Sequence, residues 1–168
     1  DIQGEPYTVA PGSRFMWFRA RMLGGRTNHW GRISLRFGPW DFKARSRDGL
    51  GDDWPVSYDD SKPYYDRLDR LVGLFGTNEG LENEPDGIFL PPPAPRAHEL
   101  LVKKACDEIG VTCIPSRIAI LTRPHGGRPA CHYCSQCGRG CTTHSMFTSP
   151  TVLLAPALKT GRLTLRTG

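Results

Sequence analysis

The sequence predicts a loop-rich α+β chain, and three observations support that class. There are 19 Gly and 15 Pro among the 168 residues, well above the usual share of about 12%, so we expect many turns. Helical periodicity is clear in only a few segments, and the strands we expect are short. Hydrophobic residues make up 38% and aromatic residues 10%, which is enough to bury a core and excludes disorder throughout.

The charge and hydropathy patterns argue against a nucleic-acid partner and against a membrane span in this chain. The formal net charge is +5, but no Lys/Arg block is dense enough to indicate a nucleic-acid surface. The longest apolar stretch runs from Val152 to Leu158 and contains Pro156, so we expect no transmembrane segment in this chain. Residues 1–5 have neither the basic nor the apolar region of a secretion signal, and we expect the natural start to be missing.

The first regular element follows a loop-dominated segment, residues 1–54, in which we expect only short strands. Ser57 and Asp60 form a capping-box pattern, and Pro63 suits a first helical turn. A helix is therefore predicted from Ser57 to about Leu74, ended by glycine. Its period places one set of residues in the interior and another in water: Tyr64, Leu68, Leu71, Val72 and Phe75 inside, and Asp66, Arg67, Asp69 and Arg70 outside.

The second half alternates connectors and short elements. Residues 77–95 are rich in Pro and Gly, which predicts an extended connector. A second helix is predicted over 96–110, with Leu100, Leu101, Ala105 and Ile109 on one side. We expect a strand over 111–121, a loop over 123–148, a short helix over 149–159 with Ser149 as N-cap, and a strand over 162–167.

Four of the six cysteines lie in one run, Cys131, Cys134, Cys137 and Cys141, spaced C-x2-C-x2-C-x3-C. Gly138 and Gly140 supply the backbone freedom that would let the thiols converge on one centre. The spacing matches that of bacterial ferredoxins, although Thr142 stands where those proteins have proline. A metal site held by these four cysteines is therefore predicted.

Three readings of the run stay open. We favour an iron–sulfur cluster, of the three-iron (3Fe-4S) kind if Cys131, Cys134 and Cys137 hold it and Cys141 cannot reach it. A ligand from elsewhere, such as Cys113, is a variant of that reading. Disulfides in an exported protein form the second alternative, because the number of cysteines is even. Zinc is the third, although zinc sites usually join two separate C-x2-C pairs.

The other distinctive segment is Arg21-Met22-Leu23-Gly24-Gly25-Arg26-Thr27-Asn28-His29-Trp30. Paired glycines let the backbone approach a ligand, and the three polar residues that follow present hydrogen-bonding groups beside it. The residues alone predict a ligand-binding loop, with a structural histidine as the alternative role for His29. The polar residues are Thr27, Asn28 and His29.

This Leu-Gly-Gly-x-Thr-x-His-Trp run resembles the flavin-contacting segment of the glucose–methanol–choline (GMC) oxidoreductase family. The resemblance continues through Asp53–Tyr58, the double-tyrosine helix, Glu108–Gly110 and residues 149–165. Together with the cysteine run, it is closest to bacterial sugar and sugar-acid dehydrogenases. The resemblance implies an incomplete fragment of a two-domain FAD-binding fold, because neither the family's G-x-G-x-x-G turn nor its late catalytic histidine is present.

The resemblance also assigns parts and roles. Residues 1–58 match the flavin-contacting segment of the FAD domain, 59–148 part of the substrate-side domain with the cysteine loop, and 149–168 a helix and strand returning to the FAD domain. Gly24, Gly25, Thr27, Asn28 and His29 would lie along the FAD. In some members the residue matching His29 is linked covalently to the flavin, which makes it an attachment candidate here.

The implied activity is oxidation of a sugar or polyol hydroxyl by hydride transfer to FAD. Electrons would leave through the iron–sulfur cluster to a cytochrome or quinone. The compartment favoured for such a respiratory dehydrogenase is the periplasm. The competing interpretation is a stand-alone, non-catalytic metal-binding or electron-transfer module.

Overall fold

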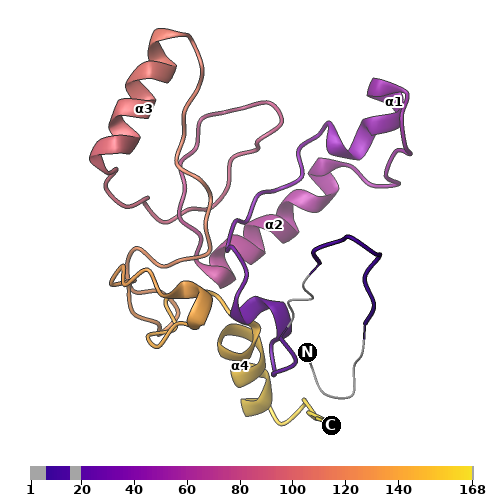
Figure 1. The fold of residues 1–168 in the computed structure, drawn as a ribbon, viewed down its shortest axis with the longest axis vertical. Helices are drawn as coiled ribbons and strands as arrows, with labels where there is room; N and C mark the ends of the chain where they lie inside the picture. The colour runs from indigo at the N-terminus through magenta and orange to yellow at the C-terminus, as the bar shows by residue number, and fades with distance from the viewer. Residues whose placement is uncertain (1–6, 16–19, 168) are drawn as a thin grey trace.

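The computed structural model describes residues 7–15 and 20–167. These residues form short helices joined by long loops (Figure 1). Residues 1–6, 16–19 and 168, which the predicted ranges 1–58 and 149–168 include, lie outside the described part. The helices, in chain order, are η1 (Gly25–Asn28), η2 (Asp41–Lys43), α1 (Ala44–Asp48), α2 (Tyr58–Val72), α3 (Ala97–Glu108), η3 (Cys137–Arg139), η4 (Pro150–Leu154) and α4 (Ala155–Lys159).

Isolated β-bridges take the place of strands in the described residues, so the strands predicted over 111–121 and 162–167 are wrong. Ile118 bridges to both Ile33 and Phe75, while Ile120 bridges to Met146. Because neighbouring residues of this segment pair with three different stretches of chain, no two stretches run together long enough for a ladder. The loop-rich, helix-containing character is confirmed, and the two-domain organisation stays a prediction.

Both ends of α2 lie where the sequence predicts. The Ser57 Oγ accepts a hydrogen bond from the Asp60 N–H at 3.2 Å, and the Ser57 N–H donates to Asp60 Oδ2 at 2.9 Å. Gly73 ends the helix at a φ of 76°, which glycine adopts without strain. His125 and Arg128 contact the last carbonyls, those of Arg70 and Val72. These two contacts with the helix C-terminus come from residues 55 and 56 positions away, so the sequence pattern does not predict them.

Asp69, the buried residue of α2, was expected in water, whereas Phe75 is buried and Arg67 and Arg70 are exposed as the period predicts. Tyr64 is 70% exposed and Leu68 51% exposed, whereas Asp69 is 4% exposed. Asp69 and Asp66 both pair with Arg36, whose side chain is buried. The physical reason is that a buried guanidinium needs carboxylates around it, and this need outweighs the burial of an apolar stripe.

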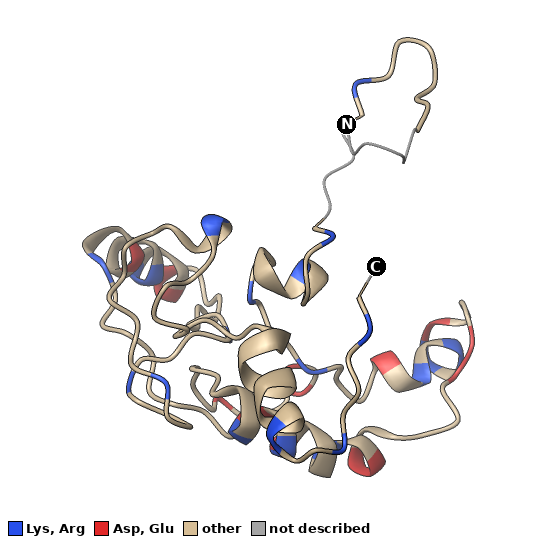
Figure 2. Ribbon diagram, turned by 90° about the horizontal axis from the view of Figure 1, so that it is seen from below, with Lys and Arg blue, Asp and Glu red and all other residues tan. Residues whose placement is uncertain are grey.

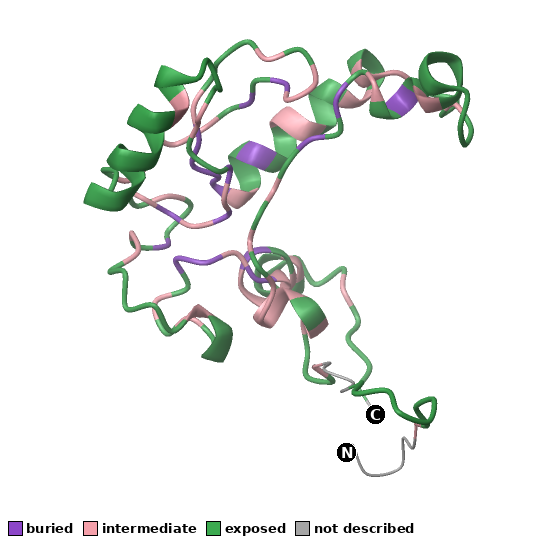
Figure 3. Cartoon of the chain, turned by 45° about the horizontal axis from the view of Figure 1, so that its top comes forward, coloured by how far each residue is buried: buried purple, intermediate pink, exposed green. Residues whose placement is uncertain are grey.

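A small apolar core lies where the central segments cross. Its members are Leu74, Phe75, Ala119, Leu121, Met146 and Val152. Arg117 lies fully buried beside it, pairs with Glu84 at 2.9 Å and donates to the Glu84 and Pro85 carbonyls. Figure 3 shows the buried stretches in these crossing segments and in one turn of α2. The core is therefore built from loops around α2 more than from helices packed together.

The helix α3 lies at the edge of the molecule and buries no residue (Figures 1 and 3). Its bounds match the sequence prediction, but its apolar side does not face an interior, because Leu100 and Leu101 are 52% and 69% exposed. At the opposite edge, the short helices η2 and α1 occupy a region expected to hold only loops and strands. There Phe42 packs against Phe37 and Trp54.

The C-terminal helix is present but built differently from the prediction. Residues Pro150–Leu154 form one π-helical stretch, which continues as α4. Ser149 itself has helical dihedral angles and makes no capping bond. Its side chain instead contacts Thr27 Oγ1 at 2.9 Å, so the start of this helix is tied to the glycine segment.

Candidate functional site

The glycine segment folds as a tight turn that leads into the 3-10 helix η1. Gly24 and Gly25 have φ angles of 94° and 48°, in the left-handed region that glycine tolerates. The Gly25 N–H donates to the Met22 carbonyl at 2.9 Å, and the Thr27 N–H donates to Gly24 at 3.1 Å. The paired glycines are thus required by the backbone path of the turn itself.

The polar side chains of the turn stabilise its shape. Thr27 Oγ1 donates to the Gly24 carbonyl at 2.7 Å. Asn28 Nδ2 donates to the Leu23 and Gly25 carbonyls at 2.9 and 3.2 Å. These groups therefore fix the conformation of the loop, and their predicted contact with a flavin stays a prediction.

The two glycines differ in what surrounds them. A Cβ added to Gly24 would lie 2.5 Å from Pro150, so this glycine permits close packing of the turn on η4. A Cβ added to Gly25 would meet nothing within 4 Å. Of the two glycines, Gly25 is therefore the one at which bare backbone faces open space.

The turn is held against residues 147–150, and this attachment could not be read from the sequence. Besides the Thr27–Ser149 contact, the Ser149 N–H donates to Thr27 Oγ1 at 3.0 Å. Trp30 Nε1 donates to the Phe147 carbonyl at 3.1 Å, and the Trp30 and Phe147 rings meet edge to face at 6.0 Å. His29 follows η1 and its N–H donates to Arg26 at 3.1 Å. The turn that carries the predicted site residues is therefore bonded to residues 147–149.

The cysteine loop has an unusual backbone. Tyr133 and Ser135 have φ angles of 54° and 59°, and Gly140 has 98°. Such left-handed dihedral angles are costly for residues other than glycine and cluster at functional loops. Gly138, which was expected to supply freedom, is not among the positions of positive φ. The loop is therefore shaped by strained non-glycine residues as well as by Gly140.

The four thiols of this loop occupy different environments. Cys131 Sγ accepts a hydrogen bond from the Tyr133 N–H at 3.3 Å, Cys134 is exposed, and Cys137 begins η3. Partial burial alone raises the pKa of Cys141, but hydrogen bonds from the Met146 N–H, from Thr143 and from the Ser145 N–H outweigh it, so the pKa lies below its usual value. Cys141 is therefore a thiol whose surroundings favour the thiolate, the form that binds soft metals.

A cavity of about 730 Å³ lies beside the loop. Cys131 and Cys137 both line it, as do the cationic side chains of Arg32 and Arg96. Within residues 7–15 and 20–167, however, no three Cys, His, Asp or Glu side chains converge as a metal site requires, and all six cysteines are free. The structure thus brings two of the four predicted ligands to one cavity and does not assemble the donor set of a cluster.

Two further sequence expectations concern Cys113 and the charge distribution. Cys113 lines a different cavity, beneath α3, and its side chain interacts with that of Cys106.

Figure 2 shows Lys and Arg dispersed along the chain among Asp and Glu. None of the helices in the described residues is both long and apolar enough to cross a bilayer.

No protein-family model matches the chain. Curated relatives do match it: it is 35% identical over 150 residues to paromamine 6'-oxidase from Streptomyces fradiae, an alignment that covers 87% of the chain and 27% of the relative. It is 30% identical over 137 residues to the fructose dehydrogenase large subunit from Gluconobacter japonicus, covering 74% of the chain and 24% of the relative.

A third relative is 2-methyl-1,2-propanediol dehydrogenase from Mycolicibacterium austroafricanum, 36% identical over 113 residues, with 64% of the chain and 20% of the relative covered. The chain thus spans about a quarter of the length of the curated relatives it matches. All three are named as oxidoreductases of alcohols or sugars.

Proposed function

Because the chain belongs to the glucose–methanol–choline oxidoreductase family, we propose that it forms the flavin-facing part of an FAD-dependent dehydrogenase that oxidises a hydroxyl of a sugar or polyol. The support comes from relatives named for paromamine, fructose and a propanediol. These alignments cover up to 87% of the chain, which favours an oxidoreductase over a stand-alone metal-binding module.

The observation that carries the proposal is the open backbone at Gly25. The turn around it is rigid, because Thr27 and Asn28 bond within it and Ser149 fastens it from outside. A rigid strip of backbone without side chains suits close approach of a planar ring. When bound, FAD supplies the hydride acceptor for alcohol oxidation. The residues of this chain position the ring, and none of them is assigned proton transfer.

The test compares two glycines at which replacement by alanine strains the backbone, because both have positive φ. Gly25 and Gly49 both have positive φ, at 48° and 76°, and an added Cβ meets nothing within 4 Å at either. In the full-length protein, Gly25→Ala is expected to weaken FAD binding at least tenfold, about 1.4 kcal/mol. Gly49→Ala, in the loop after α1, is expected to leave it unchanged. Equal FAD affinities of the two variants, measured by equilibrium dialysis, would contradict the proposal.

His29 is the proposed attachment point if the flavin is covalently bound. Its place directly after η1 keeps it in the same turn as Gly25. Acid precipitation of the flavin-loaded protein tests this: a coloured pellet that becomes colourless in His29→Asn supports attachment. A colourless pellet from the unmodified protein excludes it.

The route by which electrons leave is the least constrained part of the proposal. A cytochrome or quinone acceptor and a periplasmic setting fit a respiratory dehydrogenase, and the iron–sulfur cluster stays a prediction from the cysteine spacing. The described residues do not assemble three ligands for it, so we route no electron through the loop. Iron and sulfide analysis of the full-length protein, with Cys141→Ser as the variant, decides whether a cluster is present.

A further inference from the structure

Two cysteines that the proposed function does not use lie together at the end of α3. Cys106 is in the last turn of the helix and Cys113 is seven residues further on. Gly110 reverses the chain between them with a φ of 71°. The Cys106 carbonyl accepts hydrogen bonds from the Ile109 N–H at 3.1 Å and the Val111 N–H at 2.9 Å. The returning chain is thus fastened to the helix at the residue that carries the first thiol.

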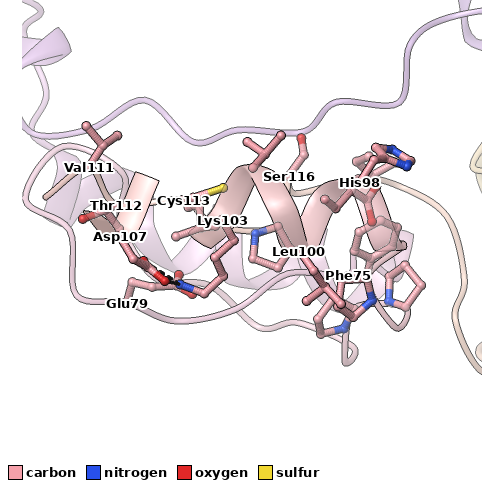
Figure 4. Close-up of a pocket in the computed structure, with 18 of the residues that line it drawn as sticks. Phe75, Glu79, His98, Leu100, Lys103, Asp107, Val111, Thr112, Cys113 and Ser116 are labelled. Atoms are coloured by element: carbon pink, nitrogen blue, oxygen red, sulfur yellow. Dashed lines mark hydrogen bonds and ion pairs between the residues drawn. The ribbon is translucent and has the colours of Figure 1, made fainter. Parts of the chain in front are cut away.

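The two cysteines are neighbours and both are partly accessible. The side chain of Cys113 interacts with that of Cys106, and each residue has intermediate exposure. Cys113 lines a cavity of about 850 Å³ together with Lys103 and Asp107, and Figure 4 shows its sulfur beside α3. A small reagent can therefore reach this pair.

We propose that Cys106 and Cys113 form a reversible disulfide that joins the end of α3 to the wall of the neighbouring cavity. Cys113 lies two residues from Val111, whose N–H is bonded to the Cys106 carbonyl at 2.9 Å, so little backbone movement is needed to bring the two thiols to bonding geometry. Of the 131–141 run, Cys131 and Cys137 line a different cavity, whose lining does not include Cys106 or Cys113. The proposal is independent of the flavin and of the proposed activity.

The reaction is thiol–disulfide exchange with a small disulfide such as oxidised glutathione. The thiolate of one cysteine attacks a glutathione sulfur, which forms a mixed disulfide and releases one glutathione thiolate. The thiolate of the other cysteine then displaces the second glutathione. The protein pair loses two electrons and two protons, and the glutathione disulfide takes them up and becomes two molecules of reduced glutathione.

The surroundings of the pair predict how the reaction depends on pH. Partial desolvation raises the pKa of Cys106, and Cys113 and Asp107 raise it further, while Lys103 opposes them. Lys103 itself pairs with Asp107 at 2.9 Å, and the other titratable groups that line this cavity are Glu79, Glu99 and His98. Thiolate is therefore scarce at Cys106 near neutrality, and oxidation is expected to accelerate as the pH rises.

Peptide mapping of the full-length protein tests the proposal without any substitution. Trypsin cuts after Lys104 and Arg117, so residues 105–117 form one peptide with both cysteines and no others. After incubation with oxidised glutathione and blocking of remaining thiols, we expect this peptide to be two hydrogen atoms lighter than its dithiol form and unblocked. Reduction before blocking should restore two blocked thiols.

Matched variants exclude other partners. In Cys106→Ser and in Cys113→Ser, the remaining thiol is expected to stop at the mixed glutathione adduct, because its internal partner is gone. The proposal is overturned if the unmodified peptide keeps two blocked thiols under oxidation. It is equally overturned if either cysteine is found joined to the 131–141 loop.

Discussion

The sequence of α2 is more amphipathic than that of α3, yet the molecule buries a polar residue of α2 and no residue of α3. Asp69 of α2 is buried against Arg36, and both ends of the helix are capped by other residues. By contrast, α3 buries no residue and its cation–carboxylate pair, Lys103–Asp107, is exposed. Helical period therefore identifies a helix but does not identify its inner face when buried arginines need partners.

Removing a carboxylate from α2 should have the largest effect. In Asp69→Ala the buried Arg36 loses an ion-pair partner and the Ile88 N–H loses its acceptor. We expect the free energy of unfolding to fall by about 3–5 kcal/mol in urea titrations. Asp107→Ala, which breaks the exposed pair on α3, should cost less than about 1 kcal/mol. Equal losses of unfolding free energy in the two variants would contradict the proposal that the ion pair of α2 matters more for stability than that of α3.

The glycines that follow the two helices form the next pair. Both have positive φ, 76° at Gly73 and 71° at Gly110. A Cβ at Gly73 would lie 2.5 Å from Leu121 and 2.9 Å from His125, whereas one at Gly110 would meet nothing within 4 Å. Gly73→Ala should therefore cost about 2–4 kcal/mol, and Gly110→Ala only the roughly 1–2 kcal/mol of the left-handed backbone. Thermal unfolding of both variants measures the difference.

The N-terminal caps give a smaller contrast. Ser57→Ala removes the side-chain acceptor for the Asp60 N–H and should destabilise the protein by about 1 kcal/mol. Arg96, which precedes α3, contributes its backbone N–H to Glu99 Oε2 at 2.6 Å. Arg96→Ala retains that bond and should change stability by less than about 0.5 kcal/mol. A larger loss in Arg96→Ala, seen by chemical unfolding, would show that α3 depends on its cap as α2 does.

The pH dependence of stability should give the smallest contrast. Burial raises the pKa of Asp66, but its bonds to Arg36 and Lys62 outweigh this and lower it. Its contribution is therefore complete above the ordinary pKa of 3.8 and is lost as the pH falls through the lowered folded value. On α3, Asp107 raises the pKa of Lys103, so that contribution is lost only as the pH rises through the raised value.

Unfolding curves across the pH range separate the two. Asp66→Asn should flatten the acid side of the stability profile and leave the alkaline side unchanged. Lys103→Met should do the reverse, by a smaller amount because the pair is exposed. An unchanged acid limb in Asp66→Asn would contradict the role given to Arg36.

The parts of the fold that sequence could predict are those set by local chemistry. The Ser57 cap, the glycine that ends α2 and the bounds of α3 depend on residues within a few positions of each other, and all are confirmed. The buried face of α2 depends on Arg36, some thirty positions away. The strand expected over 111–121 failed because Ile118 and Ile120 pair with separate segments.

In the candidate site, too, the local features could be predicted from sequence and the long-range contacts could not. The turn at Gly24 and Gly25 is local and was predictable from the paired glycines. Its attachment to Ser149 and Pro150 was not, because no motif links positions so far apart. For the cysteines, spacing alone predicted a common centre, but the side chains of Cys131 and Cys141 have separate hydrogen-bond partners.

The contact between Thr27 and Ser149 has a consequence for the nascent polypeptide. The two residues are 122 positions apart, so a ribosome releases the glycine turn long before the residues that fasten it. Contacts of such separation close late, because the intervening chain must first be ordered. The surface proposed to receive a cofactor is therefore completed only after Ser149 has been synthesised, and loading before that stage would meet an unfinished receptor.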